Sequence, residues 1–109
     1  FPIFEIHAKW FTRQLKGVFK LPSKRSMHRA VRDRRQLLVN SGKLQRHFHR
    51  LGEHQFSYFN QLAAQCGEPG LPEWFVQTWI DVGKLREQNS GGYKDVPFAV
   101  RGPTICRYN

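Results

Sequence analysis

The first third of the chain places apolar and charged side chains with the period of a helix. Apolar residues recur at steps of three and four: Phe4, Ala8, Phe11, Leu15 and Val18. Such a stripe is typical of an amphipathic helix that covers a core with one face. We predict a helix that ends at Leu21-Pro22, because the residue before a proline is pushed out of the α region, with Gly17 weakening its last turn.

A second amphipathic helix is predicted from Ser23 to Val39, with Ser23 as its N-terminal cap. Arg34 is the single polar break on its apolar side, which otherwise consists of Met27, Ala30, Val31, Leu37 and Leu38. The opposite side carries Arg25, Arg29, Arg32 and Gln36. The run 40–42, Asn-Ser-Gly, indicates a helix stop followed by a turn.

The second half of the chain predicts two more helices and one short strand. The third helix runs from Phe56 to Cys66 and ends at Gly67, and the fourth has Pro72 in its first turn and is interrupted at Gly83. A loop follows at 89–92, and the apolar run within 95–101 suits an edge strand, because it contains a proline, and is ended by Gly-Pro at 102–103. We therefore expect a mainly α fold with three to four helices, long connectors and at most one strand.

Length and composition describe one small basic domain. The chain has 109 residues, 39% of them hydrophobic, which is too apolar for a disordered tail, and we expect one domain over 1–109. It has no apolar run long enough to span a membrane and no signal-peptide layout. Because it begins with Phe1 and not Met, we expect a processed product or a fragment.

The formal net charge of +10 is unevenly distributed. Between Arg13 and Arg50 the only acidic residue is Asp33. Such a field attracts polyanions: nucleic acid, phosphate-bearing cofactors, anionic lipid or an acidic protein surface. Charge alone does not choose among them.

No group of residues indicates a catalytic or metal site. His47, His49 and His54 are close in sequence, but no cysteine or carboxylate pair at ligand spacing completes a metal site, so we expect surface or interdomain histidines. Cys66 and Cys106 do not make a disulfide framework and are expected to be free thiols. Nucleotide-binding, nucleophile-elbow and zinc-protease motifs are absent, so no catalytic residue is assigned.

A series of short motifs resembles one enzyme family. The start of the chain reads F-P-x-x-E-x-x-A-K-W, then T-R-x-x-K-G, then L-P-S-x-x-x-M. Later matches are Q-R-H at 45–47, Tyr58 with Leu-Ala at 62–63 and Gly67, and F-x-V-x-G-P at 98–103. Together they resemble the segment of flavin-containing monooxygenases that follows the nucleotide-binding domains.

The resemblance implies a role within a larger enzyme. Flavin-containing monooxygenases use FAD and NADPH to place one oxygen atom of O₂ on a nucleophilic nitrogen or sulfur. The chain would be the helical C-terminal part of a two-nucleotide-domain α/β flavoprotein, inactive alone, walling the flavin and substrate cavity. His7 stands where the family has a glutamine at the flavin, which implies an FAD contact. Phe4, Ile6, Trp10 and Phe11 would meet either a flavin domain or a substitute partner surface.

The resemblance also bears on location, and two other functions remain open. Family members are often associated with the endoplasmic reticulum membrane, which implies an intracellular protein. The charge instead suits a small basic helical module that binds nucleic acid or joins a ribonucleoprotein. The wide apolar stripe of the first helix suits an interaction domain on another protein surface.

Overall fold

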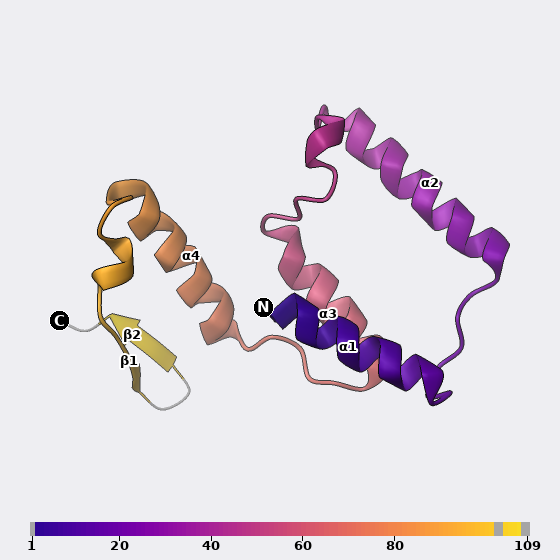
Figure 1. Cartoon of the computed structure of the whole chain (residues 1–109), viewed down its shortest axis with the longest axis horizontal. Coiled ribbons are helices and arrows are strands. Elements are labelled where there is room, and N and C mark those ends of the chain that lie inside the picture. The colour runs from indigo at the N-terminus through magenta and orange to yellow at the C-terminus, as the bar shows by residue number, and fades with distance from the viewer. Residues whose placement is uncertain (1, 102–103, 108–109) are drawn as a thin grey trace. The chain divides into compact units, whose positions relative to one another are not determined.

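The computed structural model describes residues 2–101 and 104–107, with side chains described as far as residue 98. The mainly α prediction is confirmed (Figure 1). The helices are α1 (Pro2–Leu15), α2 (Lys24–Asn40), α3 (His54–Cys66) and α4 (Glu73–Gln88), with short 3₁₀ turns η1 (Gln45–His47) and η2 (Tyr93–Asp95) and strands β1 (Phe98–Arg101) and β2 (Thr104–Arg107). Every helix in this part of the chain is too short or too polar to cross a membrane.

The chain divides into two compact units, Phe1–Pro69 and Gly70–Asn109, and each is described by itself. The first unit holds α1, η1, α2 and α3, and the second holds α4, η2 and the two strands. That residues 1–109 form one domain stays a prediction.

The core of the first unit lies where α1 packs on α3. Ile6, Ala63 and Cys66 are buried there, and four half-buried side chains surround them: Trp10, Phe19, Phe59 and Leu62. Ile6 is 1% exposed, and full burial of such a side chain stabilises a fold by about 1.5–3 kcal/mol. The expectation that Ile6 meets a missing flavin domain is therefore wrong, because this side chain fills the chain's own core.

α1 ends at Leu15, earlier than the predicted end at Leu21-Pro22. Gly17 adopts a left-handed φ of 75°, its N–H bonds the Gln14 carbonyl at 3.0 Å, and the Val18 N–H bonds the Arg13 carbonyl at 3.0 Å. This pair of bonds is the Schellman arrangement, which satisfies the last carbonyls of a helix. Gly17 therefore ends the helix, where the sequence predicts only a weakened turn.

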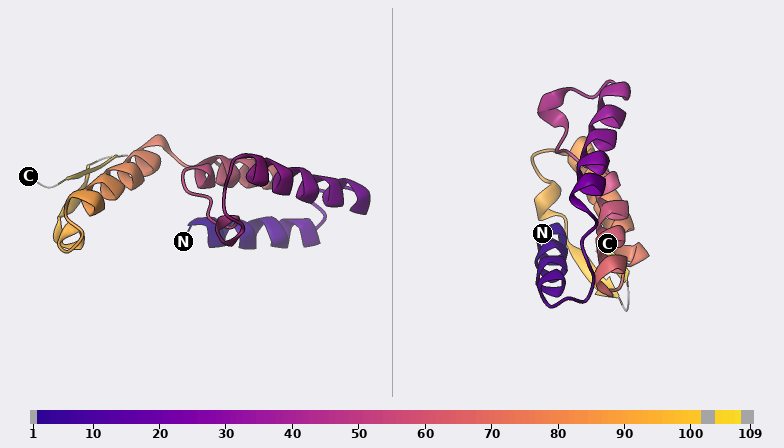
Figure 2. Two further views of the ribbon diagram at one scale, coloured as in Figure 1. Left: turned by 90° about the horizontal axis from the view of Figure 1, so that it is seen from above. Right: turned by 90° about the vertical axis from the view of Figure 1, so that its right-hand side faces the viewer.

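α2 begins and ends where the sequence predicts. The Ser23 hydroxyl accepts a hydrogen bond from the Ser26 N–H at 3.2 Å, and Gly42 adopts a φ of 73° beyond the last turn. Along the helix Leu38 alone is buried, whereas Val31 and Leu37 are 67% and 59% exposed. Figure 2 shows α2 in a layer separate from α1, to which it is joined at one end by the segment 16–23. Most of the apolar side of α2 is thus uncovered.

In the second unit a hairpin follows α4. Gly83 lies within α4, so the prediction that it interrupts this helix is wrong. The helical residues on both sides of Gly83 maintain the backbone hydrogen bonds. β1 pairs with β2 antiparallel, Phe98 opposite Arg107, so the predicted strand has a partner that the sequence analysis missed. The predicted stop at 102–103 lies outside the described residues. β2 contacts α4, whose Leu85 is buried.

Candidate functional site

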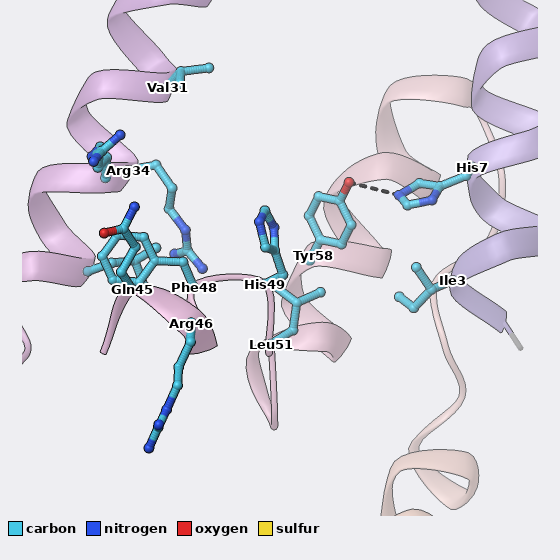
Figure 3. A pocket seen from close by; sticks show the side chains of 12 residues that line it. Ile3, His7, Val31, Arg34, Gln45, Arg46, Phe48, His49, Leu51 and Tyr58 are labelled. Carbon is cyan, nitrogen blue, oxygen red and sulfur yellow. Dashed lines mark hydrogen bonds between the residues drawn. The ribbon is translucent and has the colours of Figure 1, made fainter. Parts of the chain in front are cut away.

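The first unit contains an open hollow of about 1030 Å³ between α1, α2, α3 and the segment 45–51 (Figure 3). α2 contributes four residues to its lining: Val31, Arg34, Arg35 and Leu38. Their spacing of three, four and seven residues places them on one face of the helix. The hollow is thus lined by the apolar side of α2 that the sequence predicts, including its polar break at Arg34.

The opposite wall joins α1 to α3 through a hydrogen bond. The Nε2 atom of His7 lies 2.8 Å from the Tyr58 hydroxyl, and the two rings meet edge to face with centroids 5.6 Å apart. His7 is exposed and Tyr58 half-buried. Ile3 and Leu51 add apolar surface beside this pair (Figure 3). His7, the predicted flavin contact, is therefore held in place by α3 while its ring edge faces the hollow.

The segment after α2 forms the third wall. It supplies Gln45, Arg46, Phe48 and His49, and the ring of His49, like that of Tyr58, rises into the space between α2 and α1 (Figure 3). Arg46 donates from Nε to His47 Nε2 at 3.3 Å. A hydrogen bond from the Lys43 ammonium to the Arg50 carbonyl joins the two ends of this segment.

The lining of this hollow carries positive charge and no negative charge. Three arginines are among its lining residues, Arg34, Arg35 and Arg46, and no carboxylate is. The side chain of Arg46 runs away from the space between α2 and α1 (Figure 3). The ion pairs found in the described part of the chain all involve Glu5 or Glu68 and lie elsewhere. The hollow therefore combines positive charge with apolar and aromatic surface.

Glu68 holds α1 against the end of α3. Its carboxylate accepts from the Arg13 guanidinium and from Lys9 Nζ at 3.3 Å, while Arg13 also approaches Cys66 Sγ at 3.6 Å. The bond from Arg13, followed by that from Lys9, lowers the pKa of Glu68 below its usual value. In turn, bonds to Glu5 and Glu68 raise the pKa of Lys9, and Glu68 raises the pKa of Arg13. Trp10 adds a bond from Nε1 to Gln65 at 2.8 Å.

The described residues show how much of a cofactor site this chain can supply. No cluster of three or more histidine, cysteine, aspartate or glutamate side chains that could hold a metal occurs among them. The sheet they form is a two-stranded antiparallel hairpin, whereas dinucleotide-binding folds need a parallel sheet with helices. What the hollow does offer is hydrogen-bond donors on His7, Tyr58 and His49, which can contact the edge of a ring system held elsewhere.

Sequence reasoning located some of these residues and missed others. Arg34 was visible as the polar break in an apolar stripe, and His7 was visible through the family motif. The sequence pointed to Tyr58 only as part of a family motif. No local spacing relates it to His7, which lies 51 residues away in the chain. Nothing in the sequence distinguished Arg35 as a site residue, because it is one of many arginines in a basic segment.

Comparison with known proteins supports the family resemblance. Among curated proteins, the Arabidopsis thaliana flavin-containing monooxygenases FMO GS-OX-like 3 and FMO GS-OX-like 5 are each 36% identical to this chain over 95 residues, and FMO GS-OX-like 4 is 33% identical. Each match covers 87% of this chain and 21% of the relative. The chain is thus similar to a part of these enzymes and spans about a fifth of their length. No family model matches the sequence, and no solved structure gives a significant match.

Proposed function

We propose, from the similarity of this chain to flavin-containing monooxygenases, that it forms the helical part of such an enzyme that packs against the FAD- and NADPH-binding domains. In the whole protein it walls the flavin and substrate cavity. The complete enzyme transfers one oxygen atom of O₂ to a nitrogen or sulfur atom of its substrate, with FAD as the flavin and NADPH as the reductant. The single observation that carries this proposal is the similarity over 87% of the chain.

The exposed side of α1 supports a role in packing against other domains. Phe11 and Leu15 are 58% and 67% exposed, and Val18, just beyond the end of α1, is 60% exposed, although the sequence pattern assigns all three to a covered face. Contiguous apolar surface of this kind usually meets another protein surface. Of the residues expected at the flavin domain, Phe11 keeps that role in the proposal, while Ile6 and the half-buried Trp10 serve the packing on α3.

His7 is the proposed contact to the flavin. Its Nε2 atom is engaged with the Tyr58 hydroxyl, which restrains the ring, and its other ring nitrogen is Nδ1. A neutral imidazole can donate or accept there, so it can take over one hydrogen bond of the family's glutamine. Tyr58 acts in this proposal as a positioning residue, because it orients the imidazole without touching the flavin.

A chimera tests the packing role. The matching fifth of the Arabidopsis thaliana FMO GS-OX-like 3 is replaced by this chain, and the flavin absorbance that remains with the purified protein is measured, together with NADPH oxidation. We expect the chimera to retain flavin, and the same relative with that fifth deleted to lose it. Equal flavin content in the two proteins would contradict the proposal.

Matched variants of the chimera locate the contact. Replacing Phe11 and Leu15 by serine is expected to lower flavin retention several-fold, because two exposed apolar side chains would leave the interface. Gln61→Ser, at an exposed polar position of α3, serves as the control and should have no effect. A loss of flavin in the control alone would point to a different packing face.

Binding of nucleic acid is the second candidate function, favoured by one observation. The charged side of α2 is exposed along its length, and the chain carries a net charge of +10. Binding of this kind weakens steeply as salt rises, because counterions are released from the phosphates. Titration of the chain with a short single-stranded RNA at two salt concentrations tests it, and no binding at low salt would remove it.

A further inference from the structure

The arginines of the hollow have no assigned role in the packing proposed above. Arg34 and Arg35 stand on the same face of α2 as Val31 and Leu38, and Arg46 comes from η1 on another side of the hollow. We propose that the hollow binds a small organic oxyanion, a phosphate or sulfate ester. Arg34 and Arg35 would hold the oxyanion, and the apolar and aromatic side chains of the hollow would contact the organic body of the ligand.

The position of Arg34 and Arg35 is the first argument. Cationic side chains usually lie on the solvent side of an amphipathic helix, and Arg25, Arg29 and Arg32 do so on α2. Arg34 and Arg35, which are also exposed to solvent, line the hollow beside Leu38, the one buried residue of the helix. The two guanidinium groups add positive charge to the lining of the hollow, and positive charge in a concave site favours an anion there.

The lining supplies no such anion. None of its residues is acidic, and no ion pair of Arg34, Arg35 or Arg46 occurs within the described residues. Guanidinium groups carry only donors, and they match the oxygens of phosphate and sulfate in bidentate pairs.

The other side chains define the rest of the ligand. Phe48, Leu51 and Ile3 offer apolar surface, and Tyr58 and His49 present rings toward the same space (Figure 3). The volume of about 1030 Å³ is at the upper end of small-molecule sites, which run from about 300 to 1,000 Å³. The hollow therefore has room for an aromatic ester as well as its charged group.

The experiment needs no flavin domain, so the inference stands apart from the proposed function. The chain labelled with ¹⁵N is titrated with phenyl phosphate and phenyl sulfate at fixed salt of about 0.15 M, where distant surface charges are screened. We expect saturable amide shifts confined to 31–38 and 45–51 for at least one ester, with phenol giving weaker shifts. Binding of one ester alone identifies the kind of oxyanion, and no localised shift with either ester overturns the proposal.

Two double variants of equal charge separate a site from a diffuse field. Arg34→Gln with Arg35→Gln removes two lining cations, and Arg29→Gln with Arg32→Gln removes two from the opposite side of the same helix. The first pair should weaken ester binding by roughly tenfold or more, since each lost bond to a charged group is worth that much, and the second by less than about twofold. An equal loss in both pairs overturns the site.

A conservative variant guards against a folding artefact. Arg34→Lys keeps the charge and loses the planar fork, so it should weaken ester binding measurably while the circular dichroism of the chain stays unchanged. A short single-stranded RNA provides the last arm. The proposed site is wrong if RNA binds, if both double variants weaken RNA binding equally, and if neither ester shifts the amide signals of the hollow. The positive charge would then bind a polymer along α2.

Discussion

At the scale of single residues, Glu68 determines how α1 meets α3. The residue follows the left-handed Gly67 that ends α3, and it accepts from two cations of α1, Arg13 and Lys9. The hydrogen bond between His7 and Tyr58 depends on the same packing, because it also joins α1 to α3. A change at Glu68 is therefore expected to affect the geometry of the hollow as well as stability.

We predict a pH dependence from this carboxylate. Its pKa lies below the usual value of 4.5 in the folded chain, so its stabilisation is present above that value and is lost as the pH falls through the lowered pKa. Glu68→Gln should lower the urea midpoint at neutral pH, and the difference from the native chain should shrink under acid. Urea titrations followed by the indole N–H NMR signal of Trp10 between neutral pH and pH of about 3 measure this effect.

The control for Glu68 is Glu87→Gln, an exposed position of α4 in the other unit. It removes the same charge without touching the contact of α1 with α3. Parallel curves for native chain and Glu68→Gln at every pH would contradict the account of the carboxylate given above.

At the scale of elements, glycines at helix ends and within helices have opposite roles. Gly67 has a φ of 74° just beyond α3, a conformation that disfavours any residue with a Cβ. Gly83 lies within α4, and a Cβ placed there meets nothing within 4 Å. The same residue type thus ends one helix and merely weakens another.

We predict opposite effects for the same substitution. Gly67→Ala should destabilise the first unit by about 1–2 kcal/mol, the cost of a left-handed alanine. Gly83→Ala should stabilise α4 by about 0.5–1 kcal/mol, because alanine loses less chain entropy in a helix. Amide hydrogen exchange in α3 and α4, read separately for each helix, measures both changes, and a shift of the same sign in both would contradict the assignment.

The end of α1 shows why boundaries are harder to predict than the helices themselves. Phe11 to Val18 continue the apolar period, and proline at 22 offers a clear stop, so the pattern favours a longer helix. The local hydrogen bonds at Gly17 end it earlier. A helix period describes which residues share a face, whereas the end depends on which terminal carbonyls find a partner.

At the scale of the whole molecule, the described surface exposes apolar residues that the sequence pattern assigns to covered faces. Phe11 and Leu15 of α1 and Val31 and Leu37 of α2 are each more than half exposed. Only Ile6, Ala63 and Cys66 form the buried cluster of the first unit. A small core beside much exposed apolar surface is expected of a part that is stabilised by further contacts.

We predict that the isolated chain binds an apolar dye. The fluorescence of anilinonaphthalene sulfonate should rise in its presence, and Phe11→Ser with Leu15→Ser should reduce that rise by roughly half, because those side chains form exposed apolar surface. Gln61→Ser is again the control, and helical content should be unchanged in all variants. No rise in dye fluorescence would contradict the exposure of these apolar side chains.

Spacing along the chain was enough to predict the features that depend on near neighbours. The helical class, the Ser23 cap, the stops at Gly42 and Gly67 and the break at Arg34 all follow from spacing within a few residues, because capping and periodicity are local physics. The family motifs were likewise legible in the linear chain.

Which helix faces meet depends on the packing of the folded chain. The bond of His7 to Tyr58 and that of Arg13 to Glu68 join residues 51 and 55 positions apart, and no local spacing specifies them. Nor does the pattern say that Ile6 is enclosed by α3 while Phe11, on the neighbouring turn, stays exposed. The reason is that an amphipathic stripe states only that a face prefers to leave water, while the packing of the other helices determines what covers it.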